Sequence, residues 1–315
     1  MANTISITEK YPVLVILGSQ GFIFSHVAEY FIKKGWMVHG FDNLSAGSHP
    51  ELVPVFEQMD NFRFHKEDVS FMPVVEKIAR INPDYIIHAA AISDVDYSIK
   101  QPTKTIQANN NATLNAFEAA RRCKNLKRFL YISTDEVYGE CDHPKTEDEL
   151  MFPKNPYAVS KAFGSTLRLA YDNTYPELKD KTVETRFCNV FGGRQDSRKI
   201  IPAIKRALTT GEPVSLHNKG MGVRQWIHIS DIPPVIELLL EKGHRTYNIT
   251  SGATASVIDL IALAERATGR TVPTVPGKRV GMDMRYMMSS QRIFEEFGWK
   301  PTVDPEQALV EYFKA

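Results

Sequence analysis

The chain has 315 residues, 24% of them charged, and a formal net charge of +1 at pH 7. This length can bury a sizeable core and exceeds one average domain, and the near-zero charge argues against nucleic acid or a membrane surface as a partner. The N-terminus is polar and no apolar run could span a bilayer, so we expect neither a secretion signal nor a membrane span. Three scattered cysteines form no metal spacing and favour a reduced, cytoplasmic setting.

The first elements of the chain form a strand–helix–strand unit. The continuous apolar run Val13–Leu17 predicts a strand that is buried on both faces, and Gly18 and Gly21 follow it directly. A helix and a second strand over 36–41 come next, and Asp42 lies 21 residues after Gly21. This interval places a carboxylate on an adenosine ribose, which predicts a dinucleotide site. A carboxylate there repels a 2′-phosphate, so the pattern favours NAD over NADP.

Strands and helices continue to alternate up to about residue 187. The predicted strands are 62–66, 85–89, 129–133 and 182–187, and the predicted helices are 71–80, 109–123 and 156–172. Repeated strand–helix order predicts an α/β fold with a doubly wound parallel (Rossmann) sheet. Ligands of such sheets bind at the carboxyl ends of the strands.

The elements become shorter after residue 188, among glycines, prolines and basic residues. We therefore expect a Rossmann domain over 1–188 and a smaller substrate-binding lobe over 189–315, with a segment near 225–250 returning to the large domain. The expected elements of this part are helices at 202–209 and 231–240, strands at 214–216 and 225–229, and further elements at 247–250, 257–267 and 290–297.

Polar groups gather at the end of the predicted strand 129–133. Thr134, Asp135 and Glu136 follow this apolar run, where a buried parallel strand delivers side chains to a ligand crevice. An isolated acidic pair after a strand is more often a solvated turn. A hydroxyl and two carboxylates together instead suggest acid–base chemistry.

The predicted helix that follows adds two more ionisable groups. Asn155 can cap this helix, and Pro156 suits its first turn. Tyr157 and Lys161 then lie four residues apart on one helical face. A surface helix with a half-buried tyrosine would explain the pair alone, but not its place beside the polar strand end.

These motifs resemble a known family over nearly the whole chain. The chain is similar to the extended short-chain dehydrogenases/reductases. Ser-Thr-Asp-Glu-Val-Tyr-Gly at 133–139 resembles the nucleotide-sugar 4,6-dehydratases, above all the dTDP-glucose 4,6-dehydratases. Further matches are Asp42-Asn-Leu-Ser, Asn-Pro-Tyr-Ala-Val-Ser-Lys at 155–161, Arg224-Gln-Trp and Asp283-Met-Arg-Tyr.

The resemblance implies NAD-dependent dehydration of a nucleoside-diphosphate hexose to a 4-keto-6-deoxy sugar nucleotide. Tyr157 would take the proton of the sugar 4-hydroxyl while C4 gives hydride to NAD, and Thr134 would hydrogen-bond the reacting oxygen. Lys161 and the nicotinamide ring should lower the pKa of the Tyr157 phenol. Glu136 would remove the proton on C5, and Asp135 would protonate the C6 hydroxyl as water leaves.

The resemblance also implies binding residues and a homodimer through the helices at 109–123 and 156–172. The expected cofactor contacts are Gly18, Gln20, Gly21, Phe22, Ile23, Asp42, Asn43, Asp68, Val69, Ala89, Ala90, Ala91, Asn109, Ser133, Tyr157 and Lys161. The expected contacts to the nucleoside-diphosphate sugar are Asn189, Lys199, Arg224, Asn248 and Arg285. We expect no metal, and we interpret His217, His228 and His244 as structural.

The chain departs from the family at two places. Phe24 replaces the third loop glycine, so it must point away or push the helix outward. The loop after Ala91 has Ile92, Asp94 and Tyr97 where the family commonly has Glu, His and Arg, which leaves the base and the hexose open. Two alternatives remain: an epimerase or decarboxylase of the same fold, and a non-catalytic NAD- or sugar-nucleotide-binding protein.

Overall fold

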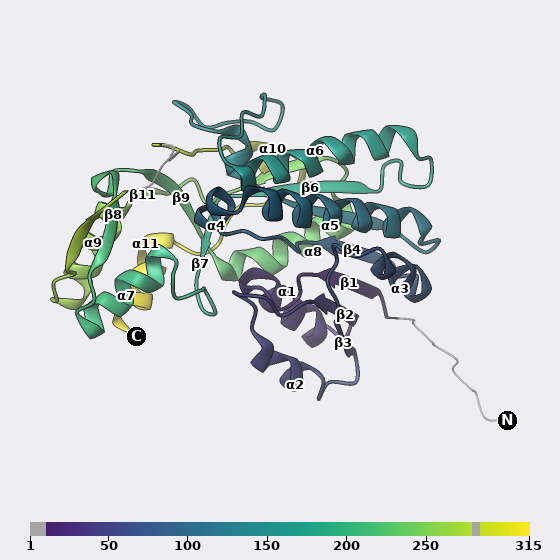
Figure 1. Ribbon diagram of the computed structural model, residues 1–315, viewed down its shortest axis with the longest axis horizontal. Coiled ribbons are helices and arrows are strands. Elements are labelled where there is room, and N and C mark those ends of the chain that lie inside the picture. Colours follow the sequence, from purple (N-terminus) through teal and green to yellow (C-terminus); the bar gives the residue numbers. More distant parts are fainter. Residues whose placement is uncertain (1–10, 279–283) are drawn as a thin grey trace.

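The computed structural model describes residues 11–278 and 284–315. A large domain is built on a seven-stranded sheet, and a smaller lobe lies at one side of it (Figure 1). All neighbouring strands of the large sheet are parallel, in the order β10-β6-β5-β4-β1-β2-β3. The strands are β1 Val13–Leu17, β2 Met37–Asp42, β3 Phe62–Lys66, β4 Tyr85–His88, β5 Arg128–Thr134, β6 Thr182–Phe187 and β10 Thr246–Ile249.

Helices cover both faces of this sheet, because each central strand is apolar on both sides. One core joins alternate strand residues such as Leu14 and Ile16 to α1 and α8, and the other joins Val15 and Leu17 to α3 and α5. The helices of the large domain are α1 Phe22–Lys33, α2 Val53–Phe56, α3 Pro73–Ile81, α4 Val95–Lys100, α5 Pro102–Arg122, α6 Pro156–Thr174, α8 Ile232–Lys242 and α10 Gln291–Phe297.

The smaller lobe has its own core around Phe191, Trp226 and Leu260. It contains a three-stranded sheet in the order β11-β9-β7 and a two-stranded sheet of β12 and β8. Its elements are β7 Asn189–Phe191, α7 Ile200–Thr210, β8 Val214–His217, β9 Val223–His228, β11 Thr254–Ser256, α9 Val257–Thr268, β12 Thr274–Gly277 and α11 Pro305–Lys314. Single 3₁₀ turns lie at Pro50–Leu52, Asp135–Tyr138, Asn218–Gly220 and Ile229–Asp231.

The predicted fold class is confirmed: the sheet is parallel, doubly wound and flanked by helices on both faces. β10 and α8 belong to the large domain, whereas β9 belongs to the small lobe. The predicted helix 109–123 begins seven residues after the start of α5, and α2, α4 and α11 were not predicted. The first turns of α5 carry polar residues, so apolar periodicity could not reveal them.

Phe24 packs inside the protein. Its side chain is 5% exposed and belongs to the core that α1 shares with β1 and α8. The ring therefore contributes to the packing of the helix on the sheet. The three cysteines are buried free thiols, and no helix among the described residues is long and apolar enough to cross a membrane.

Candidate active site

The predicted cofactor residues lie at one edge of the large sheet, at the carboxyl ends of the neighbouring strands β5, β4, β1, β2 and β3. The glycine turn follows β1, Asp42 ends β2, and Ser133 lies near the end of β5. The other members of the set follow β2, β3 and β4 or lie on α1, α5 and α6: Asn43, Asp68, Val69, Ala89, Ala90, Ala91, Phe22, Ile23, Asn109, Tyr157 and Lys161.

The glycine turn provides a place for a phosphate group. Gly18 has φ of +87°, and a Cβ there would lie 2.8 Å from the backbone nitrogen of Ala90, so only glycine lets the two loops approach. α1 begins at Gly21 with no side-chain cap, which leaves its first N–H groups for an anion. The Oε1 atom of Gln20 is buried without a hydrogen-bond partner among the described residues. These features fit a dinucleotide.

Asp42 ties the glycine turn to the loop after β2. Its carboxylate is 7% exposed and accepts from the backbone N–H of Gln20 at 3.0 Å, the N–H of Leu44 at 2.8 Å and the hydroxyl of Ser48 at 2.9 Å. A carboxylate offers about four acceptor sites, so capacity for a ribose hydroxyl remains. The arrangement fits the role that the spacing predicts.

Asn109 holds the loop after β4. Its Oδ1 accepts from the N–H of Ile92 at 2.8 Å, and its Nδ2 donates to the carbonyl of Ile92 at 3.2 Å and to the Ser160 hydroxyl at 2.9 Å. Because the side chain is 3% exposed and fully engaged, it positions the loop that borders the cofactor edge.

Thr134, Asp135 and Glu136 leave the sheet at the end of β5 and enter the 3₁₀ turn Asp135–Tyr138. The Thr134 hydroxyl caps this turn by accepting from the N–H of Glu136, and it donates to Asp135 Oδ1 at 3.1 Å. Asp135 is 4% exposed, and its Oδ2 has no hydrogen-bond partner among the described residues. Burial, together with the neighbouring charge of Glu136, raises the pKa of Asp135 to about 7.

Tyr157 and Lys161 approach this turn from α6, in the arrangement that the sequence predicts. The helix begins after Asn155, whose Oδ1 accepts from the N–H of Ala158 at 2.8 Å. Thr134 is a polar neighbour of the Tyr157 phenol and acts to lower its pKa. Lys161 is 4% exposed and donates to the carbonyl of Ile132 at 2.8 Å.

The pKa of Tyr157 differs from the expectation. Burial raises it above the ordinary value, and the charges of Glu136 and Asp135 raise it further, while Thr134 opposes the shift. Burial also lowers the pKa of Lys161 to about 8. The protein's own groups therefore do not lower the pKa of the phenol as predicted, because the two carboxylates lie close to it and the Lys161 ammonium binds a backbone carbonyl.

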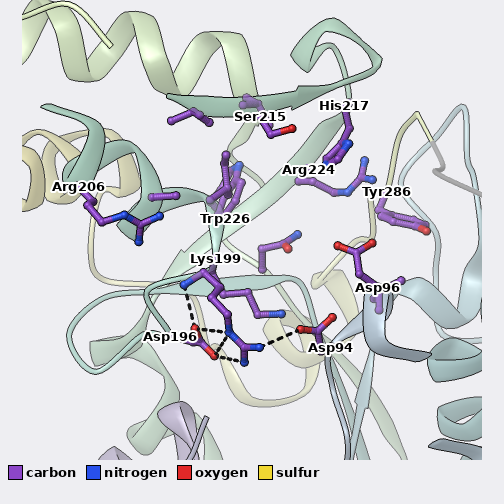
Figure 2. A pocket seen from close by; sticks show the side chains of 18 of the residues that line it. Asp94, Asp96, Asp196, Lys199, Arg206, Ser215, His217, Arg224, Trp226 and Tyr286 are labelled. Atoms are coloured by element: carbon purple, nitrogen blue, oxygen red, sulfur yellow. Dashed lines mark hydrogen bonds and ion pairs between the residues drawn. The ribbon is translucent and has the colours of Figure 1, made fainter. Parts of the chain in front are cut away.

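A cavity of about 590 Å³ opens beside Glu136 and extends into the small lobe (Figure 2). Three of the five predicted substrate residues line it: Asn189, Lys199 and Arg224. The guanidinium of Arg224 lies over the ring of Tyr286, 4.3 Å from its centre, and both residues line the cavity. The cavity is therefore lined both by the carboxylate of Glu136 and by the cationic groups of Lys199 and Arg224.

The remaining two predicted substrate residues lie elsewhere. Asn248 is fully buried, with its Oδ1 accepting from the Tyr138 hydroxyl at 2.8 Å and its Nδ2 donating to the carbonyl of Lys145 at 3.0 Å. It supports the loop beneath the site and does not reach the cavity. Arg285 is exposed and borders a second, more open depression beside Cys141.

The structure adds residues that the sequence did not single out. The Nδ2 of Asn155 donates to Glu136 Oε2 at 2.7 Å, so the helix cap also holds a carboxylate of the site. His217, interpreted from the sequence as structural, lines the cavity together with Ser215 and Trp226. No sequence spacing marked these contacts, because they join separate elements. No group of three potential metal ligands occurs within 11–278 and 284–315.

Segment 193–198 of the small lobe lies against the large domain. Two histidines donate to its backbone carbonyls, His26 to Gly193 at 2.9 Å and His49 to Arg194 at 2.7 Å. The segment therefore covers the first turns of α1 and the loop after β2.

A charged contact bridges the two domains at the cavity mouth. Arg198 pairs with Asp196 at 2.6 Å in its own segment and with Asp94 at 3.7 Å across the cavity. Asp94 also caps α4 by accepting from the N–H of Tyr97 at 2.9 Å. The loop that departs most from the family pattern thus forms part of the cavity wall.

Comparisons with known proteins agree with this architecture. The family described as GDP-mannose 4,6 dehydratase matches residues 15–312. A dTDP-glucose 4,6-dehydratase of Streptomyces griseus is 34% identical and covers 94% of this chain and 91% of its own length. A low-salt glycan biosynthesis protein of Haloferax volcanii is 32% identical, with coverages of 95% and 98%.

Solved structures place two enzyme types near this chain. A dTDP-glucose 4,6-dehydratase from Streptomyces venezuelae, crystallised with NAD, gives a TM-score of 0.89 at 28% identity and 96% coverage of both chains. A UDP-glucose 4-epimerase from Thermotoga maritima, crystallised with UDP-glucose, gives 0.87 at 28% identity, covering 96% of this chain and 98% of its own.

Proposed function

The chain belongs to the family of nucleotide-sugar 4,6-dehydratases, which are extended short-chain dehydrogenases/reductases, and from this premise we propose that it removes water from a nucleoside-diphosphate hexose. It is an NAD-dependent hydro-lyase, and its product is the 4-keto-6-deoxy sugar nucleotide. dTDP-glucose or a related sugar nucleotide is the substrate that the relatives support.

The observation that carries the proposal is the acidic pair beside the phenol. Asp135 has a pKa of about 7 and can hold a proton near neutral pH, while Glu136 borders the cavity and accepts from Asn155. A dehydration needs one carboxyl group to give a proton and another to take one. An epimerase that only oxidises and reduces C4 needs neither.

Each residue of the site has a separate role in the proposed reaction. The glycine turn and Asp42 would hold NAD, which would supply reversible hydride transfer from C4 to C6 and be unchanged at the end. Tyr157 would act as a phenolate, which the positive charge of the nicotinamide ring would have to stabilise against the raised pKa of the phenol, and would take the proton from the 4-hydroxyl. Thr134 would hydrogen-bond the same oxygen. Glu136 takes the proton from C5 and later gives it back there. Asp135 protonates the C6 hydroxyl, which leaves as water.

Charge supports the placement of the substrate. Lys199 and Arg224 line the half of the cavity formed by the small lobe, and an ammonium and a guanidinium suit the oxygens of a diphosphate. Asn189 lines the same cavity. The diphosphate would therefore occupy the far half of the cavity and direct the hexose toward Glu136.

Two further statements belong to the proposal. Exposed apolar side chains on α5 and α6 support a homodimer through these helices, among them Leu114 at 40%, Val159 at 42% and Leu169 at 50% exposure. Three buried thiols without a disulfide support a cytoplasmic location, which cell fractionation would test.

Incubation with dTDP-, UDP-, GDP- and CDP-hexoses tests the reaction. We expect at least one of them to lose one water, as read by mass spectrometry, with a 4-keto-6-deoxy product. A C4 epimer or a decarboxylated product without water loss would instead establish the alternative enzyme classes. Bound NAD with no turnover of any of the four would establish a non-catalytic binding protein.

Replacing Glu136 with Gln tests the assigned base. The variant should lose exchange of the C5 hydrogen with deuterated solvent by roughly a hundred-fold or more, because the amide cannot accept the proton. Oxidation at C4 should persist and can be followed as reduced cofactor by absorbance. Full C5 exchange in this variant would assign the base to another residue.

A further inference from the structure

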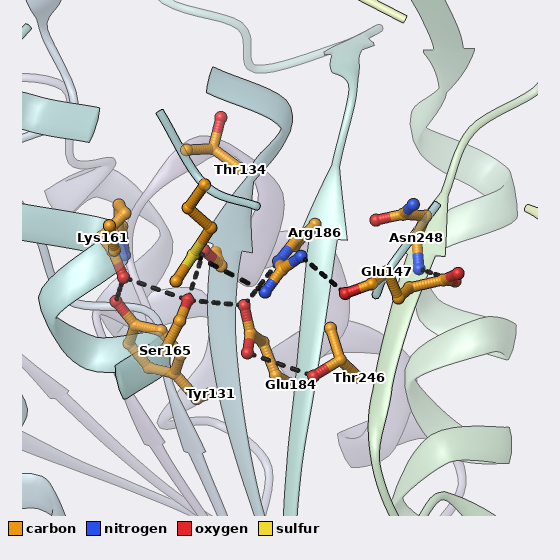
Figure 3. A network of polar contacts seen from close by, with 12 residues as sticks. Tyr131, Thr134, Glu147, Lys161, Ser165, Glu184, Arg186, Thr246 and Asn248 are labelled. Carbon is orange, nitrogen blue, oxygen red and sulfur yellow. Dashed lines mark hydrogen bonds and ion pairs between the residues drawn. The ribbon is translucent and has the colours of Figure 1, made fainter. Parts of the chain in front are cut away.

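A buried carboxylate lies beneath the active site, on strand β6. Glu184 is 1% exposed and accepts from the Ser165 hydroxyl at 2.6 Å, the Nε of Arg186 at 2.8 Å and the Thr246 hydroxyl at 3.3 Å (Figure 3). The Nε of Arg168 lies 3.7 Å from Oε2, the same oxygen of Glu184 that accepts from Thr246. Burying a carboxylate inside the protein costs free energy, so a role for Glu184 in the function of the site would explain why it is there.

One branch of this network reaches helix α6. The Ser165 hydroxyl that donates to Glu184 lies 3.3 Å from the carbonyl of Lys161. The Tyr131 hydroxyl donates to the same carbonyl at 3.0 Å. The backbone of Lys161 is therefore held against the sheet, one helical turn beyond Tyr157.

The other branch reaches the turn that carries the two carboxylates. Arg186, held by Glu184, donates to the Tyr138 hydroxyl at 2.7 Å and lies 4.8 Å from the centre of its ring. Tyr138 is the last residue of the 3₁₀ turn that begins with Asp135. Its hydroxyl donates onward to Asn248, so the end of the turn is fixed on both sides.

We propose that Glu184 is a positioning residue for the dehydration: it ties the helix of Tyr157 and Lys161 to the turn of Asp135 and Glu136. It touches no reacting atom and acts through Ser165 and Arg186. The inference deepens the proposed function and rests on it for the activity measurements. A titration of Lys161, described below, does not depend on any substrate.

Glu184 also acts on Lys161 by its charge. The groups that face Lys161 are Glu184 from β6, Tyr131 from β5 and His88 from β4. Burial keeps His88 neutral by lowering its pKa, so Glu184 is the negative charge that stabilises the ammonium. Removing it should lower the pKa of Lys161 below its value of about 8.

Glu184→Gln removes the charge and keeps the size of the side chain. We expect kcat to fall roughly ten-fold, because the catalytic groups on α6 and on the 3₁₀ turn would no longer be held in the geometry that the reaction needs. KM should change little, because Glu184 does not contact the substrate. The alkaline limb of the kcat profile should move to lower pH by roughly one unit. Lysine Cε NMR, with Lys161 assigned through Lys161→Arg, should show the same downward shift without substrate.

Glu147→Gln is the matched control. Glu147 is 8% exposed, so both variants lose a buried carboxylate, but Glu147 accepts from the backbone of Asn248 at 2.8 Å and does not face Lys161. This control should lose thermal stability and keep the alkaline limb and the Lys161 titration. Equal shifts of the alkaline limb and of the Lys161 pKa in both variants would overturn the inference, since the effect would then not be specific to Glu184.

Two more variants separate charge from contact. Glu184→Asp keeps the charge and should restore the alkaline limb, even if kcat stays low. Ser165→Ala cuts the bridge to α6 and leaves every charge in place, so kcat should fall without a shift of the limb. If Glu184→Gln does not fold, the kcat of Ser165→Ala still tests the positioning role. The inference would be overturned if Ser165→Ala kept the wild-type kcat, or if the pKa of Lys161 stayed unchanged in Glu184→Gln.

Discussion

Asp135 and Glu136 are neighbours in the chain and lie in unlike surroundings. Asp135 is enclosed, with one oxygen bonded to the Thr134 hydroxyl and the other without a partner among the described residues. Glu136 reaches the cavity and accepts from the amide of Asn155. Because burial favours the neutral form and a donated hydrogen bond favours the charged form, the two carboxyl groups are suited to opposite roles.

Replacing Asp135 with Asn should abolish dehydration and stabilise the protein in neutral and alkaline solution. The pKa of Asp135 is about 7 in the folded protein and near 3.8 when unfolded, so its burial opposes folding increasingly as pH rises from 4 to 7. Above pH 7 the variant should gain on the order of 2–4 kcal/mol, and below pH 4 almost nothing. Thermal unfolding at pH 4, 6 and 8 measures this gain.

Asp60→Asn serves as the control for this series. Asp60 is exposed, so the same chemical change should leave the unfolding temperature nearly constant at all three pH values. A gain in Asp135→Asn that is equally large at pH 4 and pH 8 would contradict the assigned ionisation. Packing or hydrogen bonding would then account for the effect.

Helix α6 depends on one residue for two tasks. Asn155 caps the helix through its Oδ1 and holds Glu136 through its Nδ2. The same side chain therefore fixes the start of the helix that carries Tyr157 and the direction of the proposed base. The sequence indicated the first task through the Asn-Pro pair but not the second, since the donor and its partner are 19 residues apart.

Two substitutions at Asn155 should separate these tasks. Asn155→Ser keeps a capping oxygen and loses the amide donor, so stability should change by only a few tenths of a kcal/mol while kcat falls roughly ten-fold. Asn155→Ala should lose the same activity and also about 1 kcal/mol of stability. Full activity in Asn155→Ser would show that Glu136 needs no such support. Thermal unfolding and steady-state kinetics provide both readings.

At the level of elements, the sequence predicted what depends on local pattern. Apolar runs located the strands of the large sheet, and the ends of those strands located the site. The strands β7, β11 and β12 have three or four residues each and were not predicted, because their pairing arises only when the lobe is assembled. Burial keeps Asn248 away from the cavity and raises the pKa of Tyr157. Neither effect could be predicted from the sequence, because burial is a property of the whole fold.

The whole molecule should be a dimer in solution. Exposed apolar residues on α5 and α6 would be covered by the same helices of a second copy, as expected for a two-fold interface. A double variant, Leu114→Lys with Phe163→Lys, should therefore sediment as a monomer, whereas wild type should sediment at twice the mass of one chain.

Leu150→Lys is the control for the interface. Leu150 is 90% exposed on the loop before α6, and its replacement should leave the dimer intact. A wild-type protein that sediments as a monomer at micromolar concentration would contradict the interface. A dimer that survives the double variant would place the contact on another surface.

The contacts of segment 193–198 have a consequence for the residence time of the cofactor. His26 and His49 fasten this segment over the first turns of α1, where the dinucleotide phosphates would lie, and Arg198 fastens its far end to Asp94. We therefore expect the closed segment to slow the departure of the cofactor. The reaction returns its hydride within each turnover, so the bound NAD does not have to be exchanged for NAD from solution. Slow dissociation of the cofactor would therefore not limit turnover, and the enzyme would not depend on the concentration of free NAD.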